Sequence, residues 1–158
     1  MIAALLMTAA VTACPAEQAV YALRTEPGVT ARFAPVEKTR DWPAGLALRI
    51  DAHGGRDWFL PWAGGTNGEQ NLASTLDPTQ PGWRPPNPDG GPRPLGNLQY
   101  LGFDETYRLF ETIPARGGPA PVHFLLPTLD DALRHPPADR PRQSIPRQFF
   151  DLVACEAP

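Results

Sequence analysis

Residues 29–62, VTARFAPVEKTRDWPAGLALRIDAHGGRDWFLPW, contain the pattern that decides the fold. Apolar and polar side chains alternate over residues 29–34 and again over residues 46–51, as they do in strands with one buried face. His53-Gly54-Gly55-Arg56 follows the second run and has the residue types of a tight turn. A third run, Asp57–Trp62, is short, apolar and rich in aromatic residues, which also favours a strand. The segment therefore predicts consecutive antiparallel hairpins.

Runs of the same kind predict further strands over residues 19–24, 98–103, 122–126 and 147–155. Glu26-Pro27-Gly28 is expected to form the turn of the first hairpin, because proline fixes one turn dihedral and glycine permits a positive φ. The sequence thus predicts a mainly β domain (α+β), built on a small antiparallel sheet or on a sandwich-like arrangement.

One or two short helices complete the expected fold. Thr128 is a suitable N-cap, and Asp130 and Asp131 follow it in the first turn, where the helix dipole favours negative charge. This helix should end before Pro136-Pro137, because proline cannot continue it. Residues 105–112 fit either a strand or a second short helix, and a helix is the preferred interpretation.

Prolines and glycines, 21 and 14 among 158 residues, interrupt the whole chain. They are densest between Gly64 and Asn97, so this segment is expected to be a long Pro/Gly-rich loop outside the sheet. It carries Trp83 and Leu95, apolar side chains that a disordered insertion would leave exposed to water. We therefore expect the loop to be ordered and anchored to the sheet by Trp58, Trp62 and Trp83.

The length corresponds to a single domain, which we place at residues 14–158. The chain has 14 basic and 17 acidic side chains and a net charge of −3. A nucleic-acid-binding face needs a basic stripe, so nucleic acid is not an expected partner. Only one of the basic residues is a lysine, a bias that we attribute to the coding composition of a bacterial genome.

Residues 1–13, MIAALLMTAAVTA, match the hydrophobic region of a secretory signal peptide. They carry no charge, and as a helix they would span only about 20 Å, too short for a hydrocarbon core of about 30 Å. Val11-Thr12-Ala13 supplies the small residues that precede a cleavage site, so cleavage is expected before Cys14. The basic residues that usually open a signal peptide are missing, and a buried N-terminal helix is the alternative. Export is the preferred interpretation.

The two cysteines, Cys14 and Cys155, lie at the two ends of the predicted mature domain. An even cysteine count in an exported chain favours a disulfide between them, and the termini of a domain often lie close together. Residues 11–14 also resemble the lipobox of bacterial lipoproteins, in which the cysteine is acylated. Acylated Cys14 would tether a periplasmic protein to the membrane, and two free thiols are the third alternative.

The sequence contains no motif for a catalytic nucleophile, a nucleotide phosphate or a cofactor. Asp51 and His53 would share one face of a strand but have no third ligand in view, so no metal site is expected. His123 lies in an apolar run and is expected to be a hydrogen-bonded core histidine.

Side chains suited to a ligand are concentrated near the long loop. Flat aromatic rings and planar donors, as sugars and other polar ligands require, come together in Arg56, Trp58, Trp62, Asn71 and Trp83. The competing interpretation, which we prefer, is that the tryptophans only anchor the loop.

The expected function is a non-enzymatic exported domain, structural or ligand-binding, with a small polar molecule or a protein as partner. The alternative is a small periplasmic hydrolase or a carbohydrate-binding module that uses residues 56–83.

Overall fold

The computed structural model describes residues 13–64 and 68–156 and consists mainly of one antiparallel sheet. Its strands are β1 (Ala19–Leu23), β2 (Glu26–Pro35), β3 (Leu46–Ala52), β4 (Gly55–Gly64), β5 (Glu69–Thr75), β6 (Asn97–Gln99), β7 (Leu101–Phe103), β8 (His123–Leu125) and β9 (Phe150–Cys155). A 3-10 turn, η1 (Ala16–Gln18), precedes β1, and one helix, α1 (Leu129–Arg134), lies between β8 and β9. The mainly β prediction is confirmed. Residues 1–12 of the signal-like segment lie outside the described residues.

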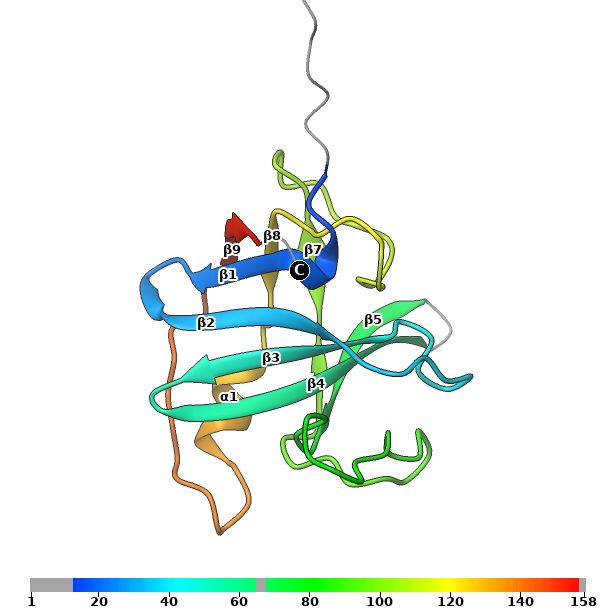
Figure 1. Ribbon diagram of the computed structural model, residues 1–158. Helices are drawn as coiled ribbons and strands as arrows, with labels where there is room; N and C mark the ends of the chain where they lie inside the picture. The colour runs from blue at the N-terminus through cyan, green and yellow to red at the C-terminus, as the bar shows by residue number, and fades with distance from the viewer. Residues whose placement is uncertain (1–12, 65–67, 157–158) are drawn as a thin grey trace, which may run out of the picture.

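The sheet curves until its two edges meet (Figure 1). The strand order is β6-β5-β4-β3-β2-β1-β9-β8-β7, and the two edge strands β6 and β7 are separated in the chain only by Tyr100. The backbone N–H of Tyr100 donates to the carbonyl of Gln70 on β5 over 3.0 Å. Residues 97–103 therefore pair first with β5 and then with β8, so the sheet forms a nearly closed barrel.

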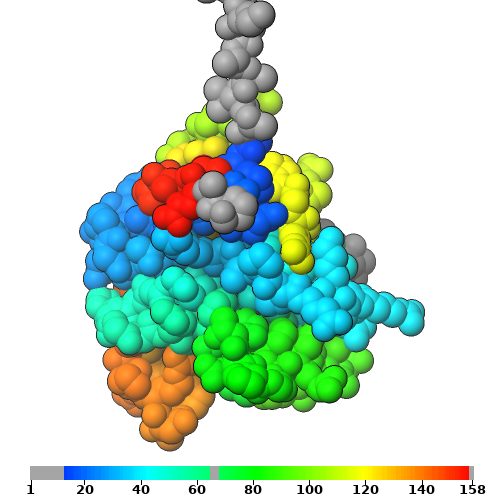
Figure 2. Space-filling model, viewed as in Figure 1, coloured from blue at the N-terminus to red at the C-terminus, as the bar shows by residue number. Residues whose placement is uncertain are grey.

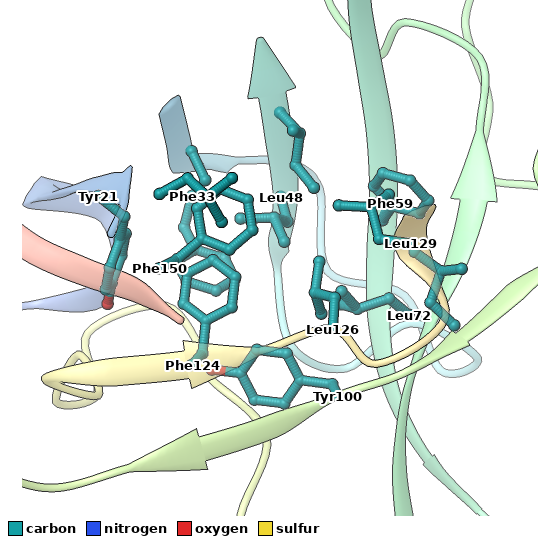
Figure 3. Close-up of a cluster of buried hydrophobic side chains, with 14 of the residues drawn as sticks. Tyr21, Phe33, Leu48, Phe59, Leu72, Tyr100, Phe124, Leu126, Leu129 and Phe150 are labelled. Carbon is teal, nitrogen blue, oxygen red and sulfur yellow. The ribbon is translucent and has the colours of Figure 1, made fainter. Parts of the chain in front are cut away.

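Apolar side chains fill the interior of this barrel (Figure 3). Alternate residues point inward from each strand, as Leu46, Leu48 and Ile50 do from β3. Several of the largest buried side chains are aromatic: Tyr21, Phe33, Phe59, Tyr100, Phe124 and Phe150. The ring of Phe124 lies 4.8 Å from the ring of Tyr21 and 4.8 Å from that of Phe150, between centroids. Because side chains occupy the interior, a ligand has to bind at an end of the barrel or on its outer face.

The helix α1 covers one end of the barrel. Leu129 and Leu133 are 2% and 4% exposed and belong to the same core as Phe59 and Leu72, which lie close to Leu129 in Figure 3. The helix begins after Thr128 and ends before Pro136, as predicted, although the Thr128 side chain makes no capping hydrogen bond. In the described part of the chain, no helix is long and apolar enough to cross a bilayer.

A second apolar cluster lies on the outer face of β3, β4 and β5. It contains Trp42, Ala47, Trp58, Leu60 and Ala73, and Trp62 and Trp83 pack against it. The loop over residues 76–96, called the Pro-rich loop below, is fastened to this face by two indoles. Nε1 of Trp83 donates to Oγ1 of Thr75 (3.2 Å), and Nε1 of Trp42 donates to the carbonyl of Pro86 (2.9 Å). Trp42 was not among the anchors expected from the sequence.

The predicted loop from Gly64 to Asn97 was too long, because residues 69–75 form β5. This strand pairs with β4 along its whole length, from Glu69 opposite Gly64 to Thr75 opposite Trp58. Leu72 points into the barrel core, but buried and exposed residues do not alternate along β5, because residues 72–75 are all buried. The other side chains of β5 are polar or small, so the composition of residues 69–75 does not indicate a strand.

The first hairpin also turns at a different place. Arg24-Thr25 forms the turn, Leu23 pairs with Glu26, and Pro27 and Gly28 belong to β2. The second hairpin turns at His53-Gly54, as predicted. Both of these residues have positive φ angles, 48° and 80°, which is the backbone of the two-residue turns that suit antiparallel strands.

Residues 105–112 form a turn instead of the preferred helix. The Asp104 carboxylate accepts hydrogen bonds from the backbone N–H groups of Thr106 (2.7 Å) and Arg108 (3.0 Å), which competes with helical pairing. Tyr107 takes a left-handed conformation with φ of 61°, and Leu109 then forms a bridge to Phe103 of β7.

Candidate functional site

A cleft of about 570 Å³ lies between β4, β5, the Pro-rich loop and the connector over residues 135–149 that follows α1. We call it the Arg56 cleft. Figure 2 shows the connector in orange beside the Pro-rich loop in green. The cleft is lined by Arg56, Asp57 and Trp58 of β4, Ser74 and Thr75 of β5, Leu76, Asp77 and residues 92–95 of the Pro-rich loop, and Pro137, Asp139 and Arg140 of the connector.

Four of these lining residues are buried and carry polar groups. Asp57, Trp58, Ser74 and Thr75 are 7%, 4%, 1% and 7% exposed. Ser74 Oγ accepts a hydrogen bond from the backbone N–H of Leu95 (2.9 Å). Thr75 Oγ1 accepts a hydrogen bond from the indole N–H of Trp83. Buried polar groups are normally satisfied in this way. Nε1 of Trp58 is the exception, because it has no hydrogen-bond acceptor among the described residues.

An ion pair joins the cleft floor to the connector. Asp57 points to the same side of β4 as Phe59, so its carboxylate lies at the end of the barrel interior. Nη2 of Arg140 donates to its Oδ1. Since an unpaired buried carboxylate is costly, this pairing explains how a charged side chain is accommodated there.

Two further charged groups of the cleft are also held in place. Arg56 donates from Nε to Oδ1 of Asp51 (2.8 Å), and its side chain is 53% exposed. Asp77 accepts hydrogen bonds from the hydroxyl (2.7 Å) and the backbone N–H (2.8 Å) of Thr79. The bond from the Thr79 hydroxyl contributes most to lowering the pKa of Asp77 below its ordinary value, so this carboxylate is charged at neutral pH.

Trp58, Trp62 and Trp83 of the predicted ligand platform pack in the outer apolar cluster, but the five platform residues do not all line one cleft. Arg56 and Trp58 line the Arg56 cleft. Trp83 lines a different groove of about 1130 Å³, together with Trp42, residues 35–41 in part, and the Pro-rich loop. Trp62 and Asn71 face each other across β4 and β5, four residues beyond Trp58 along β4.

The predicted cysteine pair forms a disulfide, with Cα atoms 5.8 Å apart. Cys14 precedes η1, and Cys155 ends β9 opposite Ala19 of β1, so the bridge joins neighbouring segments near the two ends of the domain. The bond uses the Cys14 sulfur, the atom that acylation would need.

A second polar cluster surrounds His123 on β8. Nδ1 of His123 lies 2.6 Å from Oδ1 of Asp151, and the Arg24 guanidinium donates to both oxygens of that carboxylate over 2.8 and 2.9 Å. Arg24 also donates to the Tyr107 hydroxyl (2.7 Å), and the Tyr107 ring stacks on the His123 ring at 4.5 Å between centroids. His123 is thus hydrogen-bonded, as expected, but it is half-buried at the surface and not in the core.

The hydrogen bonds from Arg24, above all, lower the pKa of Asp151. A histidine oriented by a carboxylate is the arrangement of a general base, and such a base needs a nucleophile to activate. Among residues 13–64 and 68–156, no serine, threonine or cysteine side chain forms a hydrogen bond with His123. Neither His123 nor Asp151 lines the two clefts described above.

No group of three metal-ligating side chains is found among the described residues. Asp51 forms ion pairs with Arg49 (2.7 Å) and Arg56, while His53 lies 3.5 Å from Glu26. The Asp57–Arg140 pair and the His123 cluster leave no local signal in the sequence, because each joins residues at least 28 positions apart. Compared with protein-family models, curated proteins and solved structures, this chain has no significant match.

Proposed function

We propose that this protein is an exported, non-catalytic domain that binds a small polar ligand in the Arg56 cleft. Export is supported by the uncharged apolar run at residues 1–13 and by the Cys14–Cys155 disulfide, because disulfides persist in oxidising compartments. The apolar run would be removed before Cys14.

The observation that carries the binding role is the floor of buried polar side chains at Asp57, Trp58, Ser74 and Thr75. The volume of about 570 Å³ lies within the range of about 300–1,000 Å³ of ligand sites. Leu95 and the neighbouring prolines add an apolar wall. A wall and floor of this kind suit a ligand with an apolar body and several polar groups, as sugars have.

The charged groups support binding over catalysis. The Asp57 carboxylate is paired with Arg140, and the Asp77 carboxylate is held by Thr79. Carboxylates that are hydrogen-bonded within the protein in this way are suited to be fixed contacts of a binding site. Both groups are therefore assigned to the shape and charge of the site.

The proposal is tested by recording backbone amide shifts of the disulfide-bonded protein while sugars, sugar acids, amino acids and small organic acids are added. We expect at least one compound to shift the amides of residues 56–58, 74–77 and 138–140 together, and Arg56→Ala to weaken that binding. Arg84→Ala is the matched control, because Arg84 lines the Trp42–Trp83 groove instead. Shifts confined to that groove, or none with any compound, would overturn the proposal.

Export has its own test. Mass spectrometry of the protein from its native host should give a chain that begins at Cys14 and is two hydrogens lighter than the reduced form. A mass that includes residues 1–13, or a lipid on Cys14, would contradict this expectation.

A further inference from the structure

We infer that the Trp42–Trp83 groove is a second binding site, which takes an extended segment of a partner protein and holds it by an arginine side chain. The groove shares no lining residue with the Arg56 cleft, so this site goes beyond the proposed function. Its shape, its charges and a guanidinium that the protein itself already binds beside it all point to this occupant.

The groove runs between two loops. One is the loop over residues 36–45, which joins β2 to β3, and the other is the Pro-rich loop; Figure 2 shows them in cyan and green on one face. Proline rings fix the backbone along its walls at Pro35, Pro78, Pro85, Pro86 and Pro88. Its volume of about 1130 Å³ exceeds the range of about 300–1,000 Å³ of small-molecule sites. A stiff groove of this size suits an extended peptide.

Acidic side chains outnumber basic ones along the groove. Glu37, Asp41 and Asp89 line it and are exposed, and Arg84 is the single basic side chain among its described lining residues. None of the three carboxylates belongs to an ion pair of the described residues. The lining therefore has three negative charges against one positive charge, which attracts a cation.

The two basic neighbours of these carboxylates do not cancel that charge within the groove. Lys38 and Arg40 lie on the same loop but do not line the groove. The Lys38 side chain packs against Gly45, which is also outside the lining.

Several hydrogen-bond donors of the groove are missing or already bonded. Its prolines have no backbone N–H. Nε1 of Trp42 donates to the carbonyl of Pro86, and Nε1 of Trp83 donates to Thr75 Oγ1. Carboxylates only accept hydrogen bonds, so the occupant has to bring donors. Trp83 is half-buried and lines the groove, and an indole face is the aromatic surface that attracts a cation most strongly.

Arg93 shows which cation suits this part of the protein. Its guanidinium lies 5.4 Å from the centre of the Trp42 ring, and its Nη2 donates to the carbonyls of Asn87 and Pro88, each over 3.3 Å. A planar guanidinium combines stacking on an aromatic face with hydrogen bonds to several oxygens, unlike the compact ammonium of lysine. Arg93 occupies the Trp42 ring, which leaves the Trp83 ring and the three carboxylates for the arginine of the partner.

Titration of the disulfide-bonded protein with the end-blocked peptide Gly-Arg-Gly-Arg-Gly tests the site, with versions that carry lysine or glutamine in place of arginine. We expect the arginine peptide to shift the backbone amides of residues 36–42, 82–84 and 89. It should bind about tenfold more tightly than the glutamine peptide, because it gains exposed ion pairs and a cation–π contact. The lysine peptide should bind with intermediate affinity, and added sodium chloride should weaken both.

Four exposed side chains supply the matched variants. Glu37→Gln combined with Asp41→Asn should weaken binding of the arginine peptide about three- to fivefold. Glu105→Gln combined with Glu111→Gln removes two exposed carboxylates outside the groove and should leave the affinity unchanged. Arg84→Gln should strengthen binding, because it removes the positive charge from the lining.

A glutamine peptide that binds as tightly as the arginine peptide, or no binding of either, would overturn the inference. An equal loss in both double variants would also overturn it, since the peptide would then respond to the net charge of −3 and not to the groove. Equal affinity for the lysine peptide would overturn the choice of a guanidinium. Methylguanidinium binding as tightly as the peptide would overturn the extended segment. None of these outcomes bears on ligand binding in the Arg56 cleft, because the amides that report on the two sites are different.

Discussion

Trp83 contributes to the fold through both its ring and its nitrogen. The ring packs against the outer cluster of β3, β4 and β5, and Nε1 donates to Thr75 Oγ1 over 3.2 Å. The side chain is half-buried and also lines the groove beside Trp42. Anchoring the Pro-rich loop and lining a groove are therefore compatible roles for this one residue.

Trp83→Ala should lower the free energy of unfolding by about 2–3 kcal/mol, somewhat below the usual loss of about 3–5 kcal/mol for a fully buried aromatic residue. Trp83→Phe keeps most of the ring and loses one hydrogen bond, so about 1 kcal/mol is expected. Urea unfolding at neutral pH measures both variants. An alanine variant as stable as the parent would show that the ring does not anchor the loop.

Asp151 predicts how stability depends on pH. Its pKa is lowered in the folded protein, chiefly by the hydrogen bonds from Arg24, relative to about 3.9 in the unfolded chain. The unfolded state therefore binds the proton more readily. The stabilisation is complete above the unfolded pKa and is lost as the pH falls through the lower folded pKa.

Asp151→Asn should reduce stability at pH 7 and make the stability profile flatter below pH of about 4, since the titrating group is gone. Denaturant midpoints between pH of about 2 and 7 measure the effect. Asp89→Asn, which removes a carboxylate from the exposed part of the Pro-rich loop, is the control and should leave the neutral midpoint unchanged. Identical acid profiles for Asp151→Asn and the parent would contradict the prediction.

At the scale of the elements, α1 is short but closes the end of the barrel. Its six residues place Leu129 and Leu133 in the core, where they meet side chains from β4 and β5. The connector after α1 returns Arg140 to Asp57 and forms one wall of the Arg56 cleft. The helix therefore links core packing to the geometry of the candidate site.

Leu133→Ala should lower the free energy of unfolding by about 2–4 kcal/mol, the usual loss for a buried leucine. It should also weaken the ligand binding that we propose for the Arg56 cleft, because the connector loses its support. Arg134→Ala changes a neighbouring exposed side chain and should cost no more than about 0.5 kcal/mol. Chemical unfolding of the two variants would refute the assigned role of α1 if both losses were equally small.

The strands differ in how well the sequence revealed them. β3 and β4 were predicted, because alternation and aromatic residues mark a strand with a packed face. β5 was missed, because Leu72 is its only large apolar side chain and it follows a run of glycines. The sequence predicts a helix at residues 105–112 where a turn forms, because the apolar residues of this segment fit both periods and the hydrogen bonds of Asp104 depend on local geometry.

At the scale of the whole molecule, the disulfide closes a loop of nearly the entire domain, with 141 positions between its cysteines. In the loop-entropy model a crosslink of this span stabilises the folded state by about 5 kcal/mol. Cys14→Ser combined with Cys155→Ser should therefore unfold at a clearly lower urea concentration. The parent measured with a reductant should match the double variant, and an unchanged midpoint in both would show that the bridge contributes little to stability.

The sequence by itself determined the β-rich class, α1, the second hairpin and the cysteine pair. The fold class, the helix and the hairpin depend on short-range patterns of residues, which can be read from one sequence. The cysteine pair depends on the type and number of residues. The tertiary structure alone decided the closure of the sheet at Tyr100, the pairing of Asp57 with Arg140 and the separation of Trp58 from Trp83 into different clefts. Each of these depends on strand register and on contacts between distant segments. Local periodicity sets which face of a strand is apolar, but it carries no information about which distant loop will cover that face.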